Sequence, residues 1–277
     1  MTMLHVSQAL AVLRLEWKKS FFSKRGLWVY LLALMPVLLF TAHSIMQIEM
    51  GRPCDFGLDT TILATVFQVF YLRLLVFFGC VGIFMNLFRG EALDRSLHFW
   101  FLAPVRREVI LAGKFAAGLI AAIAVFCTST FLQFVGMYLH YDSMTVRDYL
   151  FHNHGLMHLV SYVGVTALAC IGYGSIFAAA GIRYRNPIIP AAVILVWEAI
   201  NGFLPAVLQK VSIIYYLKSL CPIEISPDVP KFFTLLVVNA DPMPAAIAVP
   251  GVLIVSAVVL ALGALQLRRA EINYATE

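Results

Sequence analysis

The chain has 277 residues, of which 61% are hydrophobic and only 13% carry a charged side chain. Its mean hydropathy is +0.87, whereas soluble domains are only roughly half apolar. This composition excludes a soluble globular domain and predicts an all-α integral membrane protein with several spans. The net charge of +5 is informative only when it is divided between the two sides of the membrane.

Residues 1–26 predict an amphipathic helix at the membrane surface rather than a cleavable signal peptide. The segment is polar and basic, and the first apolar run begins only at Leu27. Large apolar residues recur every three or four positions, as on one face of a helix: Val6, Leu10, Leu13, Trp17 and Phe21. Arg14, Lys18 and Lys19 lie away from that face, where they would meet anionic headgroups of the cytosolic leaflet. The alternative is a soluble helix that docks on another subunit.

Six apolar runs follow, each near the roughly 20 residues that cross a bilayer. They cover Leu27–Gln47, Ile62–Leu87, Val109–Leu139, Leu156–Ala180, Ile188–Leu208 and Ala245–Leu267. In the third run, small residues at Gly113, Ala117 and Ala121 repeat at a spacing of four, which indicates close packing against another helix. We therefore expect a six-span domain over residues 27–277.

The distribution of lysine and arginine predicts that both termini are cytoplasmic. With the N-terminus inside, 14 of the 20 basic residues fall in cytosolic segments and five in outside loops, with Arg73 left inside a span. Because basic residues are enriched on the cytoplasmic side, this layout is favoured for a multi-pass protein of the plasma (inner) membrane.

The stretch from Phe88 to Lys114 is the most highly charged part of the chain between two spans. Its charged side chains are Arg89, Glu91, Asp94, Arg95, Arg106, Arg107, Glu108 and Lys114. Leu93, Leu97 and Trp100 recur at helical spacing, and Pro104 ends the pattern because it disfavours helix. We expect an amphipathic helix over residues 89–105 that docks a partner; an ordinary positively charged cytosolic loop is the alternative.

The outside loop at residues 209–244 contains two apolar stretches that are too short to span. Pro222, Pro227 and Pro230 are among the prolines that interrupt them. Such stretches are tolerated at membrane depth only where protein covers them, so we expect a re-entrant or capping element. Cys54 and Cys221 are the two cysteines in outside loops, and they would form a disulfide if the compartment is oxidising and their geometry permits.

Two opposite charges, Arg73 and Glu198, fall near the middle of their spans. Because a lone charge in hydrocarbon is costly, we expect these residues to pair, with Gln68 and Asn201 extending the polar network. Two roles are open for this network. It locks the helices together, or it contributes directly to a translocation path.

Other sites are not favoured by the sequence. His152, His154 and His158 are considered as metal ligands, because His154 and His158 are four residues apart and can share one helix face. No nearby acidic residue or cysteine clearly completes the set, although Asp148 is four residues before His152, and we expect no metal. A haem-bearing subunit would need histidine pairs within spans, and only His43 is well inside one. The sequence contains no G-x-x-x-x-G-K-[ST] motif for ATP, so we expect no cofactor on this chain.

The chain resembles the membrane subunits of ABC exporters of the type-2 permease family. The resemblance rests on the basic helix before the first span and on Glu91, Leu97–Leu102, Pro104, Arg106/Arg107 and Gly113-Lys114. Six spans with a long outer insertion before the last extend it over nearly the whole chain. Arg73 matches no pattern of that family.

The resemblance implies a permease subunit without catalytic residues of its own. ATP and Mg²⁺ would bind a partner ATPase, which would dock on the coupling helix at residues 89–105. A second copy of the chain and membrane lipids would be the other partners, with no role for nucleic acid. The alternative is a non-transporting membrane subunit that anchors or assembles an envelope or redox complex.

Overall fold

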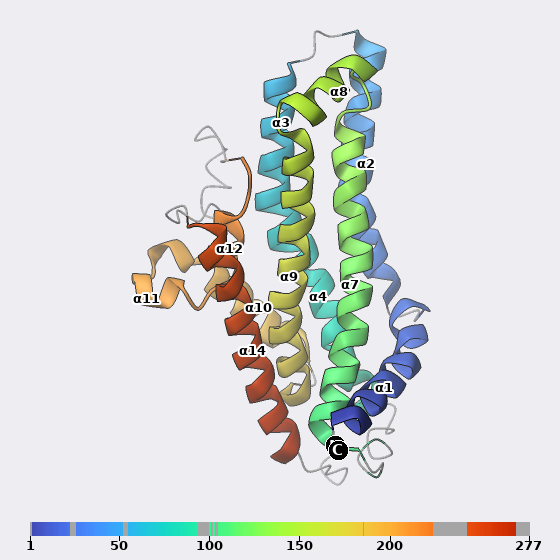
Figure 1. Cartoon of the computed structure of the whole chain (residues 1–277), viewed down its shortest axis with the longest axis vertical. Helices are drawn as coiled ribbons and strands as arrows, with labels where there is room; N and C mark the ends of the chain where they lie inside the picture. Colours follow the sequence, from blue (N-terminus) through green and yellow to red (C-terminus); the bar gives the residue numbers. More distant parts are fainter. Residues whose placement is uncertain are drawn as a thin grey trace.

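The computed structural model describes residues 2–22, 26–51, 55–93, 100, 102, 105–184, 186–223 and 243–269. This part of the chain is a bundle of helices and contains no strand (Figure 1). Five helical segments are long and apolar enough to cross a membrane: Leu27–Met50, Phe56–Phe88, Arg107–Met137, Gly155–Arg183 and Ala245–Arg269. They coincide with five of the six predicted spans, and the predicted class of helical multi-pass membrane protein is supported.

The first half of the chain forms α1 (Thr2–Phe22), α2 (Leu27–Met50) and a long helical segment that changes type twice. This segment comprises α3 (Phe56–Thr65), the π-helix η2 (Val66–Val76) and α4 (Phe77–Phe84), and α5 (Asn86–Leu93) follows it. Asp55 begins α3 by accepting hydrogen bonds from the backbone N–H groups of Gly57 and Leu58, as expected of an N-cap. Single π-turns often mark functional sites, and here 11 residues adopt this wider helix.

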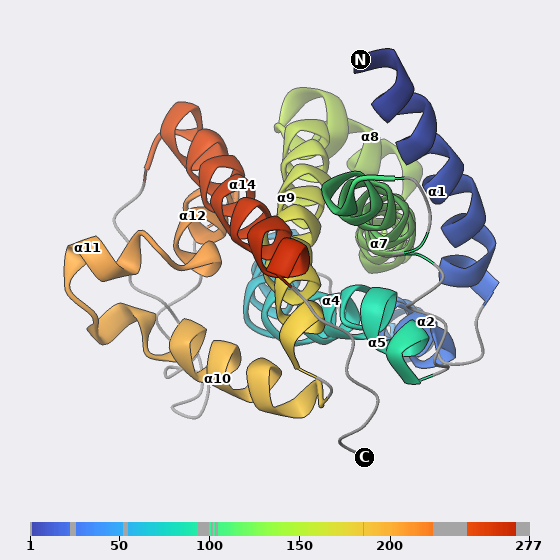
Figure 2. The ribbon, with the colours of Figure 1, turned by 90° about the horizontal axis from the view of Figure 1, so that it is seen from below.

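The second half begins with α7 (Arg107–Met137), α8 (Ser143–His152) and α9 (Gly155–Arg183). It continues with α10 (Ile188–Ala199), the 3-10 turn η3 (Asn201–Phe203), α11 (Ala206–Gln209), α12 (Ile213–Ser219) and α14 (Ala245–Arg269). Asp142 caps α8 through the backbone N–H groups of Met144 and Thr145. The long helices α7 and α9 lie at the centre of the bundle (Figures 1 and 2).

The predicted span at Ile188–Leu208 is not one continuous helix. α10 ends at Ala199 after 12 residues, which is too short to cross a bilayer of about 30 Å. Asn201 and Phe203 bound a 3-10 turn, and Pro205 then supplies no N–H for a continuing helix. The prediction counted apolar residues and took no account of these breaks. The six-span layout is therefore not confirmed.

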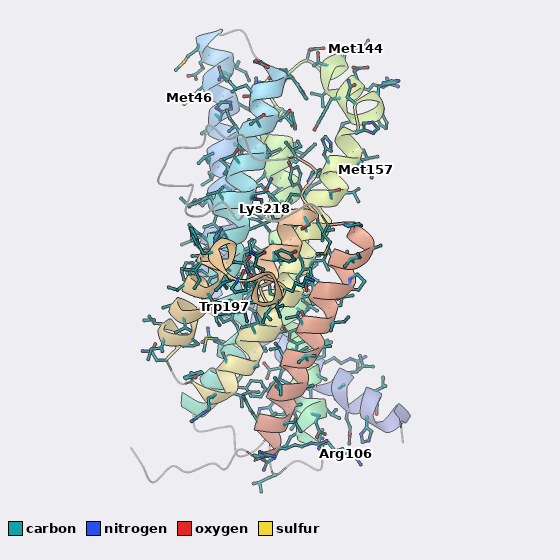
Figure 3. All side chains as sticks on the ribbon, turned by 90° about the vertical axis from the view of Figure 1, so that its left-hand side faces the viewer. Met46, Arg106, Met144, Met157, Trp197 and Lys218 are labelled. Carbon is teal, nitrogen blue, oxygen red and sulfur yellow. The ribbon has the colours of Figure 1, made fainter. Side chains whose placement is uncertain are left out.

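The chain between α10 and α12 lies at about half the height of the bundle. Figure 3 shows Trp197 and Lys218 there, far from Arg106 at one end and Met144 at the other. α12 is buried against α9 and α14, since a Cβ on Gly172 would meet Ile213 and a Cβ on Gly251 would meet Tyr216. Of the predicted outer element at residues 209–244, residues 224–242 lie outside the described residues.

One end of the bundle gathers segments that are distant in sequence. α1, the start of α7 and the end of α14 meet there, whereas α8, the end of α2 and the start of α3 lie at the opposite end (Figure 1). Viewed along the bundle, α1 lies against α7 (Figure 2). In this packing, Val6 and Leu10 on the predicted apolar face of α1 remain exposed, and Val12 and Glu16 are buried. That exposed face suits the predicted contact with a membrane surface.

Candidate functional site

A buried lysine joins four parts of the chain at the end where α1 meets α7. Lys114 Nζ donates to Glu16 Oε1 of α1 at 2.6 Å and lies 3.3 Å from the carbonyl oxygen of Leu87. It also lies 4.5 Å from the centre of the Trp100 ring. We call Glu16, Leu87, Trp100 and Lys114 the Lys114 junction. It connects α1, the end of the second span, the charged stretch and α7.

Both charges of the Lys114 junction are removed from water. The side chains of Lys114 and Glu16 are 0% and 4% exposed. Taking each ion out of water costs several kcal/mol, which only a close partner with good geometry offsets. The Trp100 ring adds a cation–π contact with the ammonium group. The carboxylate, the carbonyl and the ring together therefore compensate the buried lysine.

Gly113 permits the close approach of α1 that the Lys114 junction requires. A Cβ at position 113 would lie 2.8 Å from Val12 Cβ and 2.9 Å from the carbonyl oxygen of Ala9. Both atoms are closer than ordinary van der Waals contact, and one belongs to the backbone of α1, which cannot turn aside. The Gly-Lys pair thus allows α1 to pack onto α7 and then holds it there.

Gly113→Ala is expected to lower the free energy of unfolding by about 1–3 kcal/mol, the usual cost of overpacking. Gly164→Ala is the matched control, because Gly164 also lies within a long helix and nothing stands within 4 Å of its missing Cβ. Unfolding of both variants in detergent would be followed by circular dichroism. Equal stabilities would show that α1 is not in close contact with Gly113.

The start of α7 is also bound to the end of α14. Arg107 Nη1 donates to the carbonyl oxygens of Leu267 and Arg268, at 3.0 Å each. Glu108 forms an ion pair with Arg268. The last carbonyl groups of a helix have no partners within the helix, and a cation there also favours the helix dipole. Arg107, predicted to dock a partner, thus has an intramolecular role in joining α7 to α14.

The remaining predicted docking residues are only partly described. Arg106 is exposed at the first position before α7. Asp94 and Arg95 lie outside the described residues, and so do the side chains of Arg89 and Glu91. Docking of a partner on residues 89–105 therefore stays a prediction.

Arg73 and Glu198 are brought together at half the height of the bundle. Arg73, on the π-helix η2, donates from Nη2 to the backbone carbonyl oxygen of Glu198 at 2.7 Å. Each residue is only 2% exposed. This hydrogen bond joins the Arg73 side chain to the main chain at the end of α10, and the two opposite charges share one buried region. A direct pairing of the two side chains stays a prediction.

The Glu198 carboxylate begins α12. Its oxygens accept hydrogen bonds from Ser212 Oγ at 2.7 Å and from the backbone N–H groups of Ile213 and Ile214 at 3.0 and 2.9 Å. A carboxylate at a helix N-terminus satisfies free N–H donors and the helix dipole. Glu198 therefore joins the end of α10 to the start of α12 across the break in the chain.

Gln68 and Asn201 bind the same segment at other points. Gln68 Nε2 donates to the carbonyl oxygen of Ile223 at 2.7 Å, and Asn201 Nδ2 donates to that of Gln209 at 3.2 Å. Thus two side chains of η2, Gln68 and Arg73, hold residues 198–223 from both ends. These contacts fix the segment. A single network that links Gln68 and Asn201 to Arg73 and Glu198 stays a prediction, and so does a role in translocation.

The predicted disulfide between Cys54 and Cys221 stays a prediction. Cys54 lies outside the described residues, and Cys221 Sγ lies 3.5 Å from the carbonyl oxygen of Leu217. His158, considered as a metal ligand, instead lies 2.9 Å from the Tyr149 hydroxyl.

Glu16 was not among the predicted site residues. It is the one acidic residue among the first 26 positions, but on a helix it lies away from the predicted apolar face at Val6, Leu10, Leu13, Trp17 and Phe21. Its burial beside Val12 and its contact with Lys114 depend on how α1 packs on α7, which the sequence alone does not indicate.

Comparison of the sequence with protein-family models and with curated proteins gives no match. The chemistry of the site therefore rests on the residues described above.

Proposed function

We propose that this chain is the transmembrane subunit of an ATP-driven exporter resembling the type-2 ABC permeases. A separate ATPase subunit would bind ATP and Mg²⁺, and two copies of the chain would form the translocation unit. In this proposal the chain lies in the inner membrane with both termini in the cytoplasm, and α10–α12 form a membrane-inserted element that bends back at half depth.

The observation that carries the proposal is the Lys114 junction. Trp100 belongs to the charged stretch proposed to dock the ATPase, and its ring contacts Lys114. Lys114 in turn binds Glu16 of α1 and the carbonyl oxygen of Leu87 at the end of the second span. A displacement of the docking stretch would therefore act directly on three helices, which is what coupling to an ATPase requires.

The contacts between α7 and α14 extend this coupling path. Arg107 and Glu108 bind the end of α14, and α14 packs on α12 through Gly251 and Tyr216. Glu198 holds the start of α12, and Arg73 holds Glu198. A series of contacts thus connects the end of the bundle that would bind the ATPase to Arg73 and Glu198 at half height. In this proposal, a conformational change there would open or close the translocation path.

Charge reversal at Glu91 and Arg95 tests the docking surface. In cells that also contain the ATPase subunit, Glu91→Arg and Arg95→Glu are expected to lower the amount of co-purified ATPase at least several-fold. Arg147→Glu, which reverses an exposed charge on α8 at the opposite end, serves as the control. If ATPase recovery is the same in all three variants and the native chain, residues 89–105 are not the docking helix.

A further inference from the structure

Three arginines lie at the ends of two long helices, on the side of the bundle that contains α1. Arg183 belongs to the last turn of α9, and Arg268 and Arg269 belong to the last turn of α14. All three residues are exposed. We call them the arginine patch. It is distinct from the Lys114 junction, whose two charges are buried.

The helices α9 and α14 are in contact one turn before the arginine patch. A Cβ at Gly263 of α14 would lie 3.2 Å from Ala179 Cβ and 3.7 Å from Ile182 Cδ1, both in α9. Arg183 directly follows Ile182, and Arg268 comes little more than one turn after Gly263. The two helix ends therefore lie side by side (Figure 2), and the patch gathers charge from elements that are distant in sequence.

A neighbouring acid balances only one charge of the arginine patch. Glu108 of α7 forms an ion pair with Arg268. Within the residues that the structure describes, Arg183 and Arg269 form no ion pair. Two guanidinium groups at this surface are thus left without a compensating carboxylate on the described part of the chain.

The helix dipole of α14 does not account for the arginine patch. A cation in the last turn of a helix is favoured by the dipole and by the free carbonyl groups there. At the end of α14, Arg107 already has this role, because its Nη1 donates to the carbonyl oxygens of Leu267 and Arg268 at 3.0 Å each. The charge of Arg269 is therefore available to an anion from outside the chain.

The surface next to the arginine patch is apolar and exposed. Leu265 and Leu262, one and two turns before Arg269 in α14, are both exposed, and so are Ile188 and Ile189 at the start of α10. In the most apolar stretch of α14, only 17% of the residues are buried. Along α14 the exposed surface thus changes from apolar to cationic within one helical turn, as it does where hydrocarbon meets lipid headgroups.

We infer that the arginine patch binds the headgroup of an anionic phospholipid, whose acyl chains lie along the exposed leucines of α14. A guanidinium group donates two parallel hydrogen bonds to a phosphate, and the apolar stem of arginine lets its charge reach the headgroup level. Basic residues between helix ends at a membrane surface suit such headgroups. A headgroup with two phosphates matches the two arginines that no carboxylate balances.

A lipid fits these surroundings better than a soluble anion does. Inorganic phosphate would satisfy the guanidinium groups but would not cover Leu262 and Leu265 beside them. A zwitterionic lipid would bring its own positive group next to the arginines. The inference requires that the chain spans a membrane, and it does not depend on an ATPase partner.

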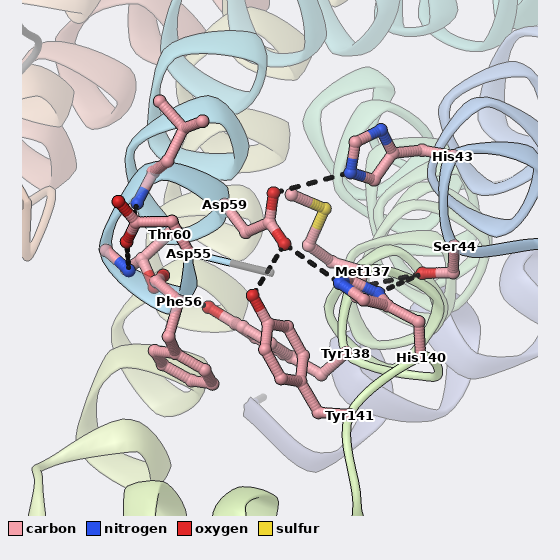
Figure 4. Close-up of polar contacts among 12 residues, drawn as sticks. His43, Ser44, Asp55, Phe56, Asp59, Thr60, Met137, Tyr138, His140 and Tyr141 are labelled. Carbon is pink, nitrogen blue, oxygen red and sulfur yellow. Dashed lines mark hydrogen bonds and ion pairs between the residues drawn. The ribbon is translucent and has the colours of Figure 1, made fainter. Parts of the chain in front are cut away.

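The opposite end of the bundle provides the contrast. Arg147 is exposed on α8, but it directly precedes Asp148. Other acidic side chains lie at the same end: Asp55 begins α3, and Asp59 accepts a hydrogen bond from the Tyr141 hydroxyl (Figure 4). Arg147 is therefore a matched control, an exposed arginine in acidic surroundings.

The test uses the full chain in detergent, with cardiolipin, phosphatidylcholine of the same acyl chains, or inorganic phosphate as the additive. We expect cardiolipin to raise the thermal unfolding midpoint by roughly 2–4 °C and to remain bound in native mass spectra. The double variant Arg183→Gln, Arg269→Gln should bind cardiolipin roughly tenfold more weakly, and Arg147→Gln should bind it as the wild type does. Arg268 is left unchanged because it pairs with Glu108.

Equal binding of cardiolipin and phosphatidylcholine, or equal binding of cardiolipin by the wild type and the double variant, would overturn the inference. Equal stabilisation by inorganic phosphate would also overturn it and would assign the patch to a soluble anion. The wild type provides a readout that needs no variant. Its affinity for cardiolipin should fall several-fold between about 50 and about 500 mM salt, because salt screens exposed ionic contacts, and an unchanged affinity would contradict the inference.

Discussion

Lys114→Met is expected to lower the free energy of unfolding by about 3–5 kcal/mol, the usual cost of leaving one ion of a buried pair without its partner. Glu16 would remain 4% exposed with no cation beside it, and the Leu87 carbonyl and the Trp100 ring would lose their contacts with the ammonium group. The measurement is the unfolding midpoint in detergent, together with the yield of folded protein.

Two further variants distinguish the loss of the ion pair from a general effect of substitution at this end of the bundle. Glu16→Gln combined with Lys114→Met leaves no buried charge, so the double variant should be more stable than Lys114→Met alone. Arg106→Met removes the same charge from an exposed position beside α7 and should change the stability by less than about 0.5 kcal/mol. Strictly additive effects of the two substitutions at 16 and 114 would show that these residues are not partners.

Glu198→Ala is expected to lower the free energy of unfolding by a similar amount, on the order of 3–5 kcal/mol. It removes the acceptor of three hydrogen bonds at the start of α12 and leaves the buried guanidinium of Arg73 without the nearby negative charge. Ser212→Ala removes one of these bonds and should cost about 1 kcal/mol. Unfolding of the purified variants in nanodiscs measures both.

Two control variants accompany Glu198→Ala: a conservative change at the same position and a change of an exposed glutamate. Glu198→Gln keeps one acceptor oxygen, so its stability should lie between those of Glu198→Ala and the wild type. Glu49→Ala removes a glutamate that is exposed at the end of α2 and should leave the stability almost unchanged. If Glu198→Ala is no more harmful than Glu49→Ala, the carboxylate does not hold the start of α12.

The long helices could be predicted because each is a continuous apolar run, and α2, α7, α9 and α14 begin within two residues of the predicted positions. The break after Ala199 could not be predicted from composition, since residues 188–208 remain apolar on both sides of it. Asn201 and Pro205 were the local signals that should have divided this run.

The candidate sites show which parts of a buried polar network a sequence reveals. Charges inside spans are conspicuous, so Arg73 and Glu198 could be singled out, and their common depth predicted their proximity. The contact of Arg73 with the main-chain carbonyl oxygen of Glu198 could not be predicted, because the sequence does not show that residues 66–76 form a π-helix. Asp59 lies close to His43 and His140, which come from other elements, and the arrangement of these elements has no local signature in the sequence.

In the proposed function, this chain transmits the action of an ATPase subunit to helices in the membrane. The decisive experiment is purification of the chain from its native membrane, followed by native mass spectrometry. We expect a complex of two copies of the chain with two ATPase subunits that carry a phosphate-binding loop, and this complex should hydrolyse ATP. Recovery of the chain alone, or only with proteins that bind no nucleotide, would refute the proposed function and favour a membrane anchor.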